Sequence, residues 1–363
     1  MEGLARALKV FLQSNEEALA KPLPKYRVVV PEKIHQLKVH PETAQIRPVV
    51  VAAILRNINF TQASYESFID LQDKLHNGIG RRRQIVSMGT HDLDTVNGPF
   101  SYEAVAPECI SFIPLNQEAL VDGMGMMSLY ETDNKLKKFL PIIRDSPVYP
   151  VIYDSNRTVM SVPPIINSNH SKISLNTKNV FIEITATDET KALVALNTIT
   201  IEFSKYCNEP EIVEAVKIIY PDGRTVITPD FSDREEIVDV EYVNRCIGVK
   251  LTGEEMVGYL KRMFVESEVI NSGKQLRVFV PPHRSDIFHA CDVMEDVAIA
   301  YGFNNIPQSI PKSSTIASAF PLNKLTDLLR REVALVGFSE VLTLTLCSHK
   351  ENFEYLNTMQ IFE

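Results

Sequence analysis

Residues 281–307 read PPHRSDIFHACDVMEDVAIAYGFNNIP, and this stretch decides how the chain is organised. An apolar, β-rich run at 276–280 (LRVFV) predicts a strand that ends at Pro281 and Pro282. The residues that follow have a helical hydrophobic period, and Gly302 is a typical helix stop. The stretch therefore predicts a strand that leads into a helix.

Four acidic residues belong to this strand-to-helix unit: Asp286, Asp292, Glu295 and Asp296. Helical spacing puts the last three on one face, and Asp286 lies about a turn and a half upstream, within reach of the same spot. Converging carboxylates repel one another unless a cation lies between them, and Mg²⁺ prefers oxygen ligands. The four acids are therefore candidate magnesium ligands. The alternative is a solvated helix face, or acids that favour the first turn because of the helix dipole.

The same stretch strongly resembles the metal-bearing segment of phenylalanyl-tRNA synthetase β subunits of the archaeal and eukaryotic cytosolic type. In that family a Pro-Pro-x-Arg-x-Asp-Ile strand end precedes an acidic helix, which closes in Tyr-Gly-aromatic-Asn-Asn-Ile. The resemblance implies that the four acids form one side of a Mg²⁺ site. It also implies that the α subunit of an α2β2 heterotetramer completes this site.

The composition favours a cytoplasmic protein without a membrane segment. No apolar run in the 363 residues approaches the ~20 residues that a membrane span needs. The five cysteines are scattered without CxxC spacing, which argues against disulfides or zinc and for a reducing compartment. The net charge of −9 argues against a protein whose whole surface is basic and binds nucleic acid. Local basic clusters at 81–83 and 135–138 are candidates for an RNA-docking face, or are ordinary solvated surface.

A second group of motifs lies between residues 149 and 188. The runs YPVIYDSN (149–156), SVPPIINS (161–168) and TKNVFIEITATD (177–188) predict strands joined by polar turns. Glu183 falls within the apolar part of the third run. A carboxylate at such a position either lies on the solvent face or is buried for a purpose.

These three blocks match the editing domain of the same family closely and in order. The resemblance implies a pocket that hydrolyses mischarged tyrosine, with Ile152 as its large aliphatic residue, Ser161 as its serine, Glu183 as its acid and Thr185 as its threonine. Archaeal members carry aspartate where this chain has Glu183. The string GTHDLD at 89–94 also matches this domain, and we interpret it as structural support near the pocket rather than as its chemistry.

Physical chemistry explains why an editing pocket is needed. A pocket shaped for phenylalanine cannot strongly reject an analogue that merely adds a hydroxyl. A second site should hold a hydrogen-bond acceptor that phenylalanine leaves unpaired, and the carboxylate of Glu183 suits this role. The sequence contains no visible nucleophile. We therefore expect hydrolysis to rest on a positioned water, with help from the terminal hydroxyl of the tRNA.

The expected architecture is α+β and multidomain. We expect a remnant of an N-terminal domain and linker at 1–32, a mixed-sheet tRNA-editing domain at 33–230, a small winged-helix-like domain with the Mg²⁺ site at 231–308, and the start of a catalytic-like domain at 309–363. Both ends of the family pattern are missing from the sequence, so we expect a fragment or truncated form.

The resemblance implies the β subunit of a phenylalanine–tRNA ligase, which supports Phe-tRNA(Phe) formation with the α subunit and hydrolyses Tyr-tRNA(Phe). The sequence contains neither GxGxxG nor GxxxxGK[ST], so we expect the aminoacylation chemistry in the α subunit. The alternative is a non-enzymatic assembly and RNA-docking scaffold with an inactive pocket. A free-standing metal hydrolase is disfavoured, because the acidic stretch offers only His283 and His289 as bases.

Overall fold

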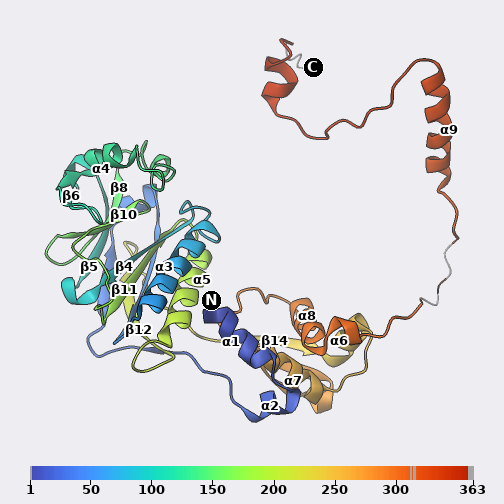
Figure 1. Ribbon diagram of the computed structural model, residues 1–363, viewed down its shortest axis with the longest axis horizontal. Helices are drawn as coiled ribbons and strands as arrows, with labels where there is room; N and C mark the ends of the chain where they lie inside the picture. Colours follow the sequence, from blue (N-terminus) through green and yellow to red (C-terminus); the bar gives the residue numbers. More distant parts are fainter. Residues whose placement is uncertain (1, 311–312, 314–315, 359–363) are drawn as a thin grey trace. The chain divides into compact units, whose positions relative to one another are not determined.

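The computed structural model describes residues 2–310, 313 and 316–358 (Figure 1). Parts of the expected segments 1–32 and 309–363, namely residues 1, 311–312, 314–315 and 359–363, lie outside the described residues. The chain divides into a first unit that ends at Pro307 and a second unit that begins at Gln308. Each unit is described by itself.

A large mixed sheet forms the centre of the first unit. Its strands follow the order β10-β9-β8-β5-β2-β12-β3-β11-β4, and β1 and β13 also pair with β12. β2 runs parallel to both β5 and β12, whereas the pairings of β11 with β3 and β4 are antiparallel. The bounds are β1 (Arg27–Val29), β2 (His35–Val39), β3 (Val49–Leu55), β4 (Val86–Asp92), β5 (Phe100–Val105), β8 (Tyr149–Tyr153), β9 (Val159–Val162), β10 (Ile166–Asn167), β11 (Val180–Ala186), β12 (Ile212–Ile219) and β13 (Thr225–Thr228). The mixed α+β class expected from the sequence is confirmed.

Two helices cover one face of this sheet, α3 (Gln62–Asn77) and α5 (Glu189–Ser204). They lie side by side and bury the β3 and β11 side chains that point toward them (Figure 1). The alternate side chains of the same strands pack with β5, β8 and β9 on the opposite face. Because both faces are covered, β3 and β11 are apolar along nearly their whole length instead of alternating with polar residues.

The sheet curves until its first and last strands, β10 and β4, contact each other. Side chains join the two strands there: Asn167 Nδ2 donates a hydrogen bond to Thr90 O at 3.3 Å. We call this contact between β10 and β4 the seam. A smaller layer with β6 (Ser111–Phe112), β7 (Val121–Asp122) and α4 (Gly123–Tyr130) packs its own apolar cluster against β8 and β9.

The remainder of the first unit is a second lobe with three helices and a three-stranded antiparallel sheet of order β14-β16-β15. Its elements are β14 (Arg234–Asp239), α6 (Val240–Ile247), α7 (Gly253–Arg262), β15 (Glu266–Ile270), β16 (Gln275–Val280) and α8 (Ala290–Tyr301). β16 and α8 are the strand and helix predicted from the opening stretch. Their apolar residues pack into one cluster with α6 and α7.

The N-terminal helices α1 (Glu2–Phe11) and α2 (Asn15–Ala20) link the two lobes of the first unit. α1 contacts both α5 and α7, and α2 packs on α7. Arg6 Nη2 lies 2.5 Å from Glu202 Oε1 on α5, while Arg262 Nε on α7 donates to Phe11 O at 3.1 Å. The N-terminal segment therefore belongs to the packed structure of this unit.

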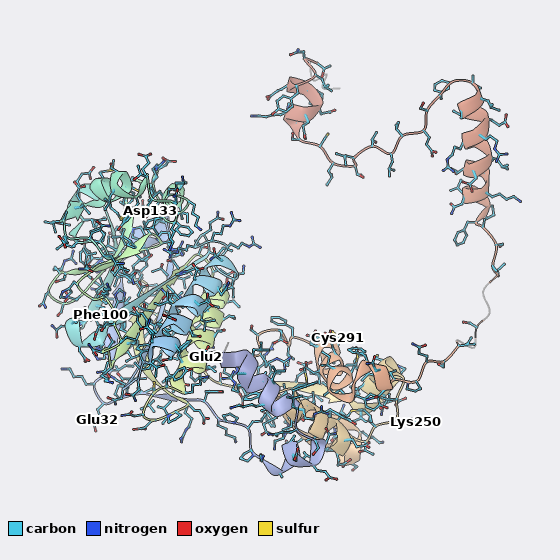
Figure 2. The ribbon with its side chains drawn as sticks, viewed as in Figure 1. Glu2, Glu32, Phe100, Asp133, Lys250 and Cys291 are labelled. Atoms are coloured by element: carbon cyan, nitrogen blue, oxygen red, sulfur yellow. The ribbon has the colours of Figure 1, made fainter. Side chains whose placement is uncertain are left out.

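The described part of the second unit contains α9 (Pro321–Leu335) and one short helical turn at 350–354. α9 has the predicted amphipathic spacing, and its leucine side chains are exposed. Figure 2 shows side chains projecting from this helix. Among the described residues, no helix has both the length and the apolarity to cross a membrane.

Candidate functional site

Glu183 on β11 is the centre of the candidate site. Its side chain is 1% exposed, and the strand register places it between Ala52 of β3 and Gly89 of β4. Because side chains alternate along a strand, Glu183 points away from α3 and α5, on the same face as Phe181 and Thr185. The carboxylate is therefore enclosed by the curved sheet.

The structure brings three of the four predicted pocket residues together. Ser161 Oγ on β9 donates a hydrogen bond to Glu183 Oε1 at 2.8 Å. Ile152 on β8 is the register partner of Ser161 and is fully buried. Thr185 lies on the same face two residues after Glu183, but its hydroxyl oxygen accepts a hydrogen bond from Arg47 Nε at 3.2 Å. In this arrangement the hydroxyl of Thr185 therefore serves as a hydrogen-bond acceptor for Arg47.

Arg47 is a member of the site that the sequence did not single out. It is 1% exposed, and besides Thr185 it donates to the backbone oxygens of Arg83, Gln84 and Ile85 at 3.0–3.3 Å. Burial lowers the pKa of this guanidinium, and the carboxylate of Glu183 opposes that shift. Arg47 thus fixes the segment after α3 against β11. An arginine at the start of the apolar run RPVVVAAILR is the sequence signal that could have indicated it.

His91 on β4 belongs to the GTHDLD string, for which the sequence predicts only structural support near the pocket. Its ring is fully buried, Nδ1 lies 2.7 Å from Ser171 Oγ, and Nε2 lies 3.7 Å from Glu183 Oε1. Neither His91 Nε2 nor Glu183 Oε2 has a hydrogen-bond partner among the described residues. Each unpaired buried polar group costs about 1–3 kcal/mol. A ligand hydroxyl that bonds to both atoms would recover much of that cost. Gly89 and His91 are two residues apart on one strand, so their side-chain positions share a face. This spacing is the sequence signal that both face Glu183.

Gly89 permits the close approach of β4 to the carboxylate. A Cβ atom built at this position would lie 2.1 Å from Glu183 Oε1 and 2.9 Å from His91 Nε2. Any other residue would therefore displace the carboxylate or the strand. The glycine of the string GTHDLD is required by contact with Glu183.

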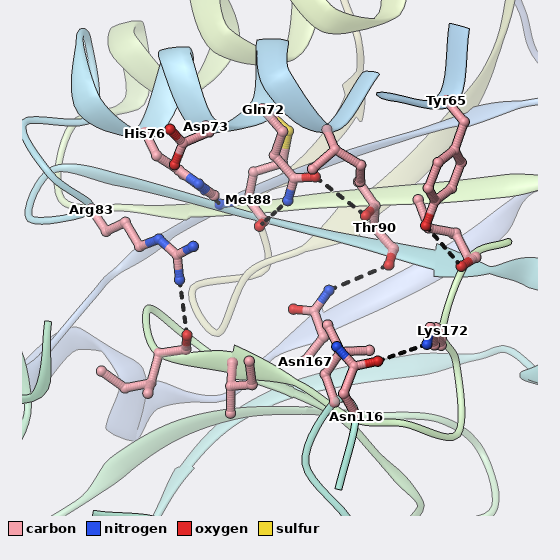
Figure 3. A pocket seen from close by; sticks show the side chains of 15 residues that line it. Tyr65, Gln72, Asp73, His76, Arg83, Met88, Thr90, Asn116, Asn167 and Lys172 are labelled. Atoms are coloured by element: carbon pink, nitrogen blue, oxygen red, sulfur yellow. Dashed lines mark hydrogen bonds between the residues drawn. The ribbon is translucent and has the colours of Figure 1, made fainter. Parts of the chain in front are cut away.

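Two hollows meet at the seam. The inner recess has a volume of about 10 Å³ and is lined by Glu183, Gly89, Ser161 and the Pro163–Pro164 turn. The outer cavity has a volume of about 460 Å³ and lies between α3, β4, β10 and the segments around 116 and 172 (Figure 3). The two hollows share part of their walls, formed by Arg83, Met88, Ile166 and Asn167.

Side chains from α3 satisfy the backbone of β4 where it faces the outer cavity. His76 Nε2 accepts a hydrogen bond from Met88 N at 2.8 Å, and Gln72 Nε2 donates to Met88 O at 3.0 Å (Figure 3). Burial holds the pKa of His76 well below its usual value, so the ring is neutral and its proton is on Nδ1. These contacts satisfy the backbone N–H and C=O of Met88 beside the outer cavity.

The four predicted metal ligands lie around α8, but they do not gather at one point. Arg284 donates to both Asp286 and Asp296, with its nitrogens 2.7–3.2 Å from their carboxylate oxygens. Asp292 Oδ2 instead accepts from Phe288 N at 2.8 Å and His289 N at 2.9 Å at the helix start. Glu295 is exposed.

The side chains as placed do not fit a Mg²⁺ ion. Among the described residues, no three histidine, cysteine, aspartate or glutamate side chains form a group that could hold a metal. The positive charge between Asp286 and Asp296 is supplied by Arg284, whose hydrogen bond lowers the pKa of Asp286. Burial raises the pKa of Asp296 to about 6 despite this partner. The four acids do not converge in this arrangement: Arg284 pairs with Asp286 and Asp296, the backbone before α8 bonds to Asp292, and Glu295 is exposed. The magnesium site stays a prediction.

Comparison with known proteins identifies similar chains. Residues 42–218 match the B3/4 domain family, residues 237–303 match the tRNA synthetase B5 domain family, and residues 306–360 match the family described as the phenylalanyl tRNA synthetase beta chain CLM domain. The proteins named phenylalanine–tRNA ligase beta subunit from Drosophila melanogaster and Homo sapiens are 54% and 49% identical to this chain, over 98% and 97% of its length. The chain spans 59% of the length of each.

A solved structure is also similar. The crystal structure of an N-terminal fragment of the phenylalanyl-tRNA synthetase β subunit from Pyrococcus horikoshii superimposes with a TM-score of 0.75 at 32% sequence identity. The match covers 83% of this chain and 82% of that one. An Arabidopsis thaliana relative, 50% identical over 98% of this chain, carries the word cytoplasmic in its name.

Proposed function

This chain belongs to the family of phenylalanyl-tRNA synthetase β subunits, and on that premise we propose that it removes tyrosine from mischarged tRNA(Phe). The editing role falls to residues 33–230, and residues 231–308 and 309–363 form the regions that follow. With an α subunit, in an α2β2 assembly in the cytoplasm, the β subunit supports the formation of Phe-tRNA(Phe).

The observation that carries this proposal is the unpaired hydrogen-bonding capacity of Glu183 and His91. The phenol O–H of tyrosine donates to Glu183 Oε2, and the phenol oxygen accepts from His91 Nε2 when Nδ1 takes its hydrogen bond from Ser171. Phenylalanine leaves both buried atoms unpaired, so the pocket should bind a phenylalanyl group several-fold or more weakly than a tyrosyl group. The pair therefore selects for the extra hydroxyl that a synthetic pocket cannot exclude.

The hydrolytic step requires water at the ester carbonyl. The Pro163–Pro164 turn lines the recess beside the carboxylate, Ile152 lies next to Ser161 in the sheet, and Ser161 orients Glu183 through its hydrogen bond. These residues bind and orient the aminoacyl group. The terminal hydroxyl of the tRNA lies next to the ester bond by its chemistry and assists the attack of a positioned water.

The magnesium site implied by the family stays a prediction that the side-chain arrangement does not favour. No step of the proposed reaction passes through a metal. The test is to assemble α and β subunits with and without Mg²⁺, using a β chain that carries Asp292→Asn and Glu295→Gln. If the wild type and the variant assemble equally strongly, and Mg²⁺ changes neither, Asp292 only bonds to the helix start and Glu295 is only a surface acid.

A non-enzymatic scaffold is the second candidate function. The small volume of the inner recess favours it, because about 10 Å³ holds no more than a water molecule until the seam opens. Incubation of the chain with Tyr-tRNA(Phe) and Phe-tRNA(Phe) separates the two candidates. Release of tyrosine at a rate well above both the uncatalysed rate and the rate for phenylalanine supports editing. Binding of tRNA without turnover supports the scaffold.

A further inference from the structure

We propose that a cavity at the junction of the two lobes of the first unit binds a free α-amino acid with a large apolar side chain. The cavity is lined by residues 23–27, by Phe231 and Asp233, and by residues of the second lobe around Phe264 and His283. We call it the junction cavity. It shares no lining residue with the two hollows at the seam, and the inference does not depend on the proposed editing function.

The junction cavity lies where both chain connections between the lobes cross the second lobe. The first connection runs from α2, which packs on α7, to β1 of the large sheet, and the second runs from β13 of that sheet to β14. Each connection contributes one wall, and β15 and β16 with the turns beside them contribute the third. The volume is about 220 Å³. Sites for drug-sized ligands usually have about 300–1,000 Å³, so this cavity suits a molecule as small as one amino acid.

The walls of the junction cavity are mainly aromatic. Four rings and two prolines line it, namely Tyr26, Phe231, Phe264, Phe279, Pro281 and Pro282. Phe279 is half-buried and faces away from the core of the second lobe, which contains its strand neighbours Val278 and Val280. An apolar side chain that enters this space leaves water, and a ligand ring can make edge-to-face contacts there. The walls therefore favour a ligand with a large apolar group.

Charged groups of both signs line the same cavity. Lys25 and Arg27 belong to the first connection, and Asp233 belongs to the second. These three side chains are exposed, and none makes a hydrogen bond or an ion pair with another described residue. Glu266 is a fourth charged group, but its carboxylate already accepts from Leu23 N at 3.3 Å. A ligand with a charge of one sign would meet a repelling side chain, whereas a zwitterion offers a partner to both signs.

His283 supplies hydrogen-bonding groups that the described residues do not use. Both of its ring nitrogens are buried without a hydrogen-bond partner, and the residue lines the cavity. Burial lowers the pKa of His283 to about 3, so the ring is neutral, with one nitrogen that donates and one that accepts. The carboxylate of an amino acid accepts and its ammonium group donates, so either group can pair with the ring and relieve the unpaired nitrogen. An α-amino acid joins these two polar groups to one apolar side chain, as the cavity requires.

The first test measures ligand binding to the 363-residue chain by calorimetry. L-leucine and L-phenylalanine are the probes, since they present an aliphatic and an aromatic side chain. Isocaproate and phenylpropionate are their analogues without the ammonium group, and isoamylamine and phenylethylamine are those without the carboxylate. We expect at least one amino acid to bind about tenfold or more tightly than both of its analogues. A smaller advantage, or no binding of either amino acid up to about 5 mM, overturns the proposal.

Two pairs of variants test the location. Asp233→Asn removes the free carboxylate, and Asp70→Asn makes the same change at an exposed position of α3. Leu23→Trp fills the cavity, whereas Leu12→Trp adds similar bulk at a residue that is 79% exposed and does not line it. We expect Asp233→Asn and Leu23→Trp to weaken binding about tenfold or more, with both controls within twofold of the wild type. Asp233→Asn conserves size at an exposed position, so unchanged binding by this variant places the amino acid elsewhere, the editing recess included, and overturns the proposal.

Protection from trypsin gives an independent readout. The bonds after Lys25 and Arg27 lie in the first connection, and both side chains are exposed in the free protein. A ligand whose carboxylate pairs with these side chains keeps them from the protease. We expect a saturating amino acid to slow cleavage at these bonds about threefold or more, and to leave cleavage after Lys324 on α9 unchanged. Equal cleavage with and without the amino acid shows that it does not bind at the first connection, which overturns the proposal.

Discussion

Glu183 Oε1 lies 2.8 Å from Ser161 Oγ, although their strands, β11 and β9, are not neighbours in the sheet. The contact spans the interior of the curved sheet and sets the carboxylate next to the seam. Ser161 uses only one of the two oxygens, so Glu183 Oε2 keeps its capacity for a ligand. The predictions that follow test this arrangement and its surroundings.

Glu183→Ala should reduce the discrimination between Tyr-tRNA(Phe) and Phe-tRNA(Phe). Loss of a charged acceptor for a phenol costs about 1.5–3 kcal/mol, which is on the order of tenfold or more in the ratio of the two deacylation rates. Glu235→Ala on β14 is the control, because Glu235 is exposed and lies in the second lobe. A Glu183→Ala chain with the full rate and selectivity of the wild type would contradict the prediction.

Gly89→Ala should destabilise the first unit by roughly 1–3 kcal/mol, because its Cβ would overlap the carboxylate of Glu183. The combination of Gly89→Ala with Glu183→Ala should be more stable than Gly89→Ala alone, since the shorter side chain removes the overlap. Urea unfolding of the two single variants and the double variant measures this coupling. Strictly additive effects would show that the two positions do not interact.

His91 should contribute to selectivity through Nε2 rather than through Nδ1. Asparagine at this position can keep the hydrogen bond with Ser171 but has no group at the place of Nε2, whereas glutamine reaches that place. We expect His91→Asn to lose selectivity for tyrosine by about three- to tenfold and His91→Gln to keep more of it. Deacylation assays with both charged tRNAs decide the matter. Similar losses in both variants would indicate that the ring serves only to support the fold.

Millimolar Mg²⁺ should leave the unfolding midpoint of the isolated chain unchanged. Arg284 already neutralises Asp286 and Asp296, and Asp292 already accepts two backbone hydrogen bonds. Mg²⁺ gives up its waters reluctantly, so it does not displace such partners readily. A thermal melt with and without the ion tests this, with EDTA as the control. A clear rise of the midpoint in Mg²⁺ would show that the acids turn from Arg284 to bind the metal.

His283→Phe should reduce the stability that the first unit loses when the pH falls from 7.5 to 5. Burial lowers the pKa of His283 to about 3, and neither ring nitrogen has a hydrogen-bond partner among the described residues. The unfolded chain therefore binds more protons than the folded one between that value and the ordinary pKa, and the wild type loses stability as the pH falls through this window.

We expect His283→Phe to abolish about 1–2 kcal/mol of this loss between pH 7.5 and 5. The aromatic contacts of His283 with Tyr26 and Phe264 suit a phenyl ring in the same place. Urea unfolding at both pH values gives the difference. His170→Phe, at an exposed position, is the control. An unchanged pH dependence in His283→Phe would show that this histidine titrates normally.

The sequence alone was sufficient for the α+β class and for the strands that carry the candidate site. The apolar runs at 149–153 and 180–186 are long and bounded by polar turns, so local propensity and burial agree. The strand at 275–280 and the helix at 290–301 follow for the same reason. The family resemblance in these segments supplied Glu183 and Ser161 as residues of one pocket, and the structure adds the hydrogen bond between them.

Only the tertiary structure decided which groups surround Glu183 and which ones neutralise the acids of α8. Arg47 precedes β3 and His91 lies on β4, and both come close to β11 only after the sheet has formed, so no spacing in the sequence links them to Glu183. Helical spacing correctly placed Asp292 and Asp296 on one helix, but Arg284 precedes that helix and pairs with Asp296 through a turn. A periodic pattern specifies which residues share a face. The partner of a buried charge depends on which chain segment packs against that face, and that is fixed by three-dimensional packing.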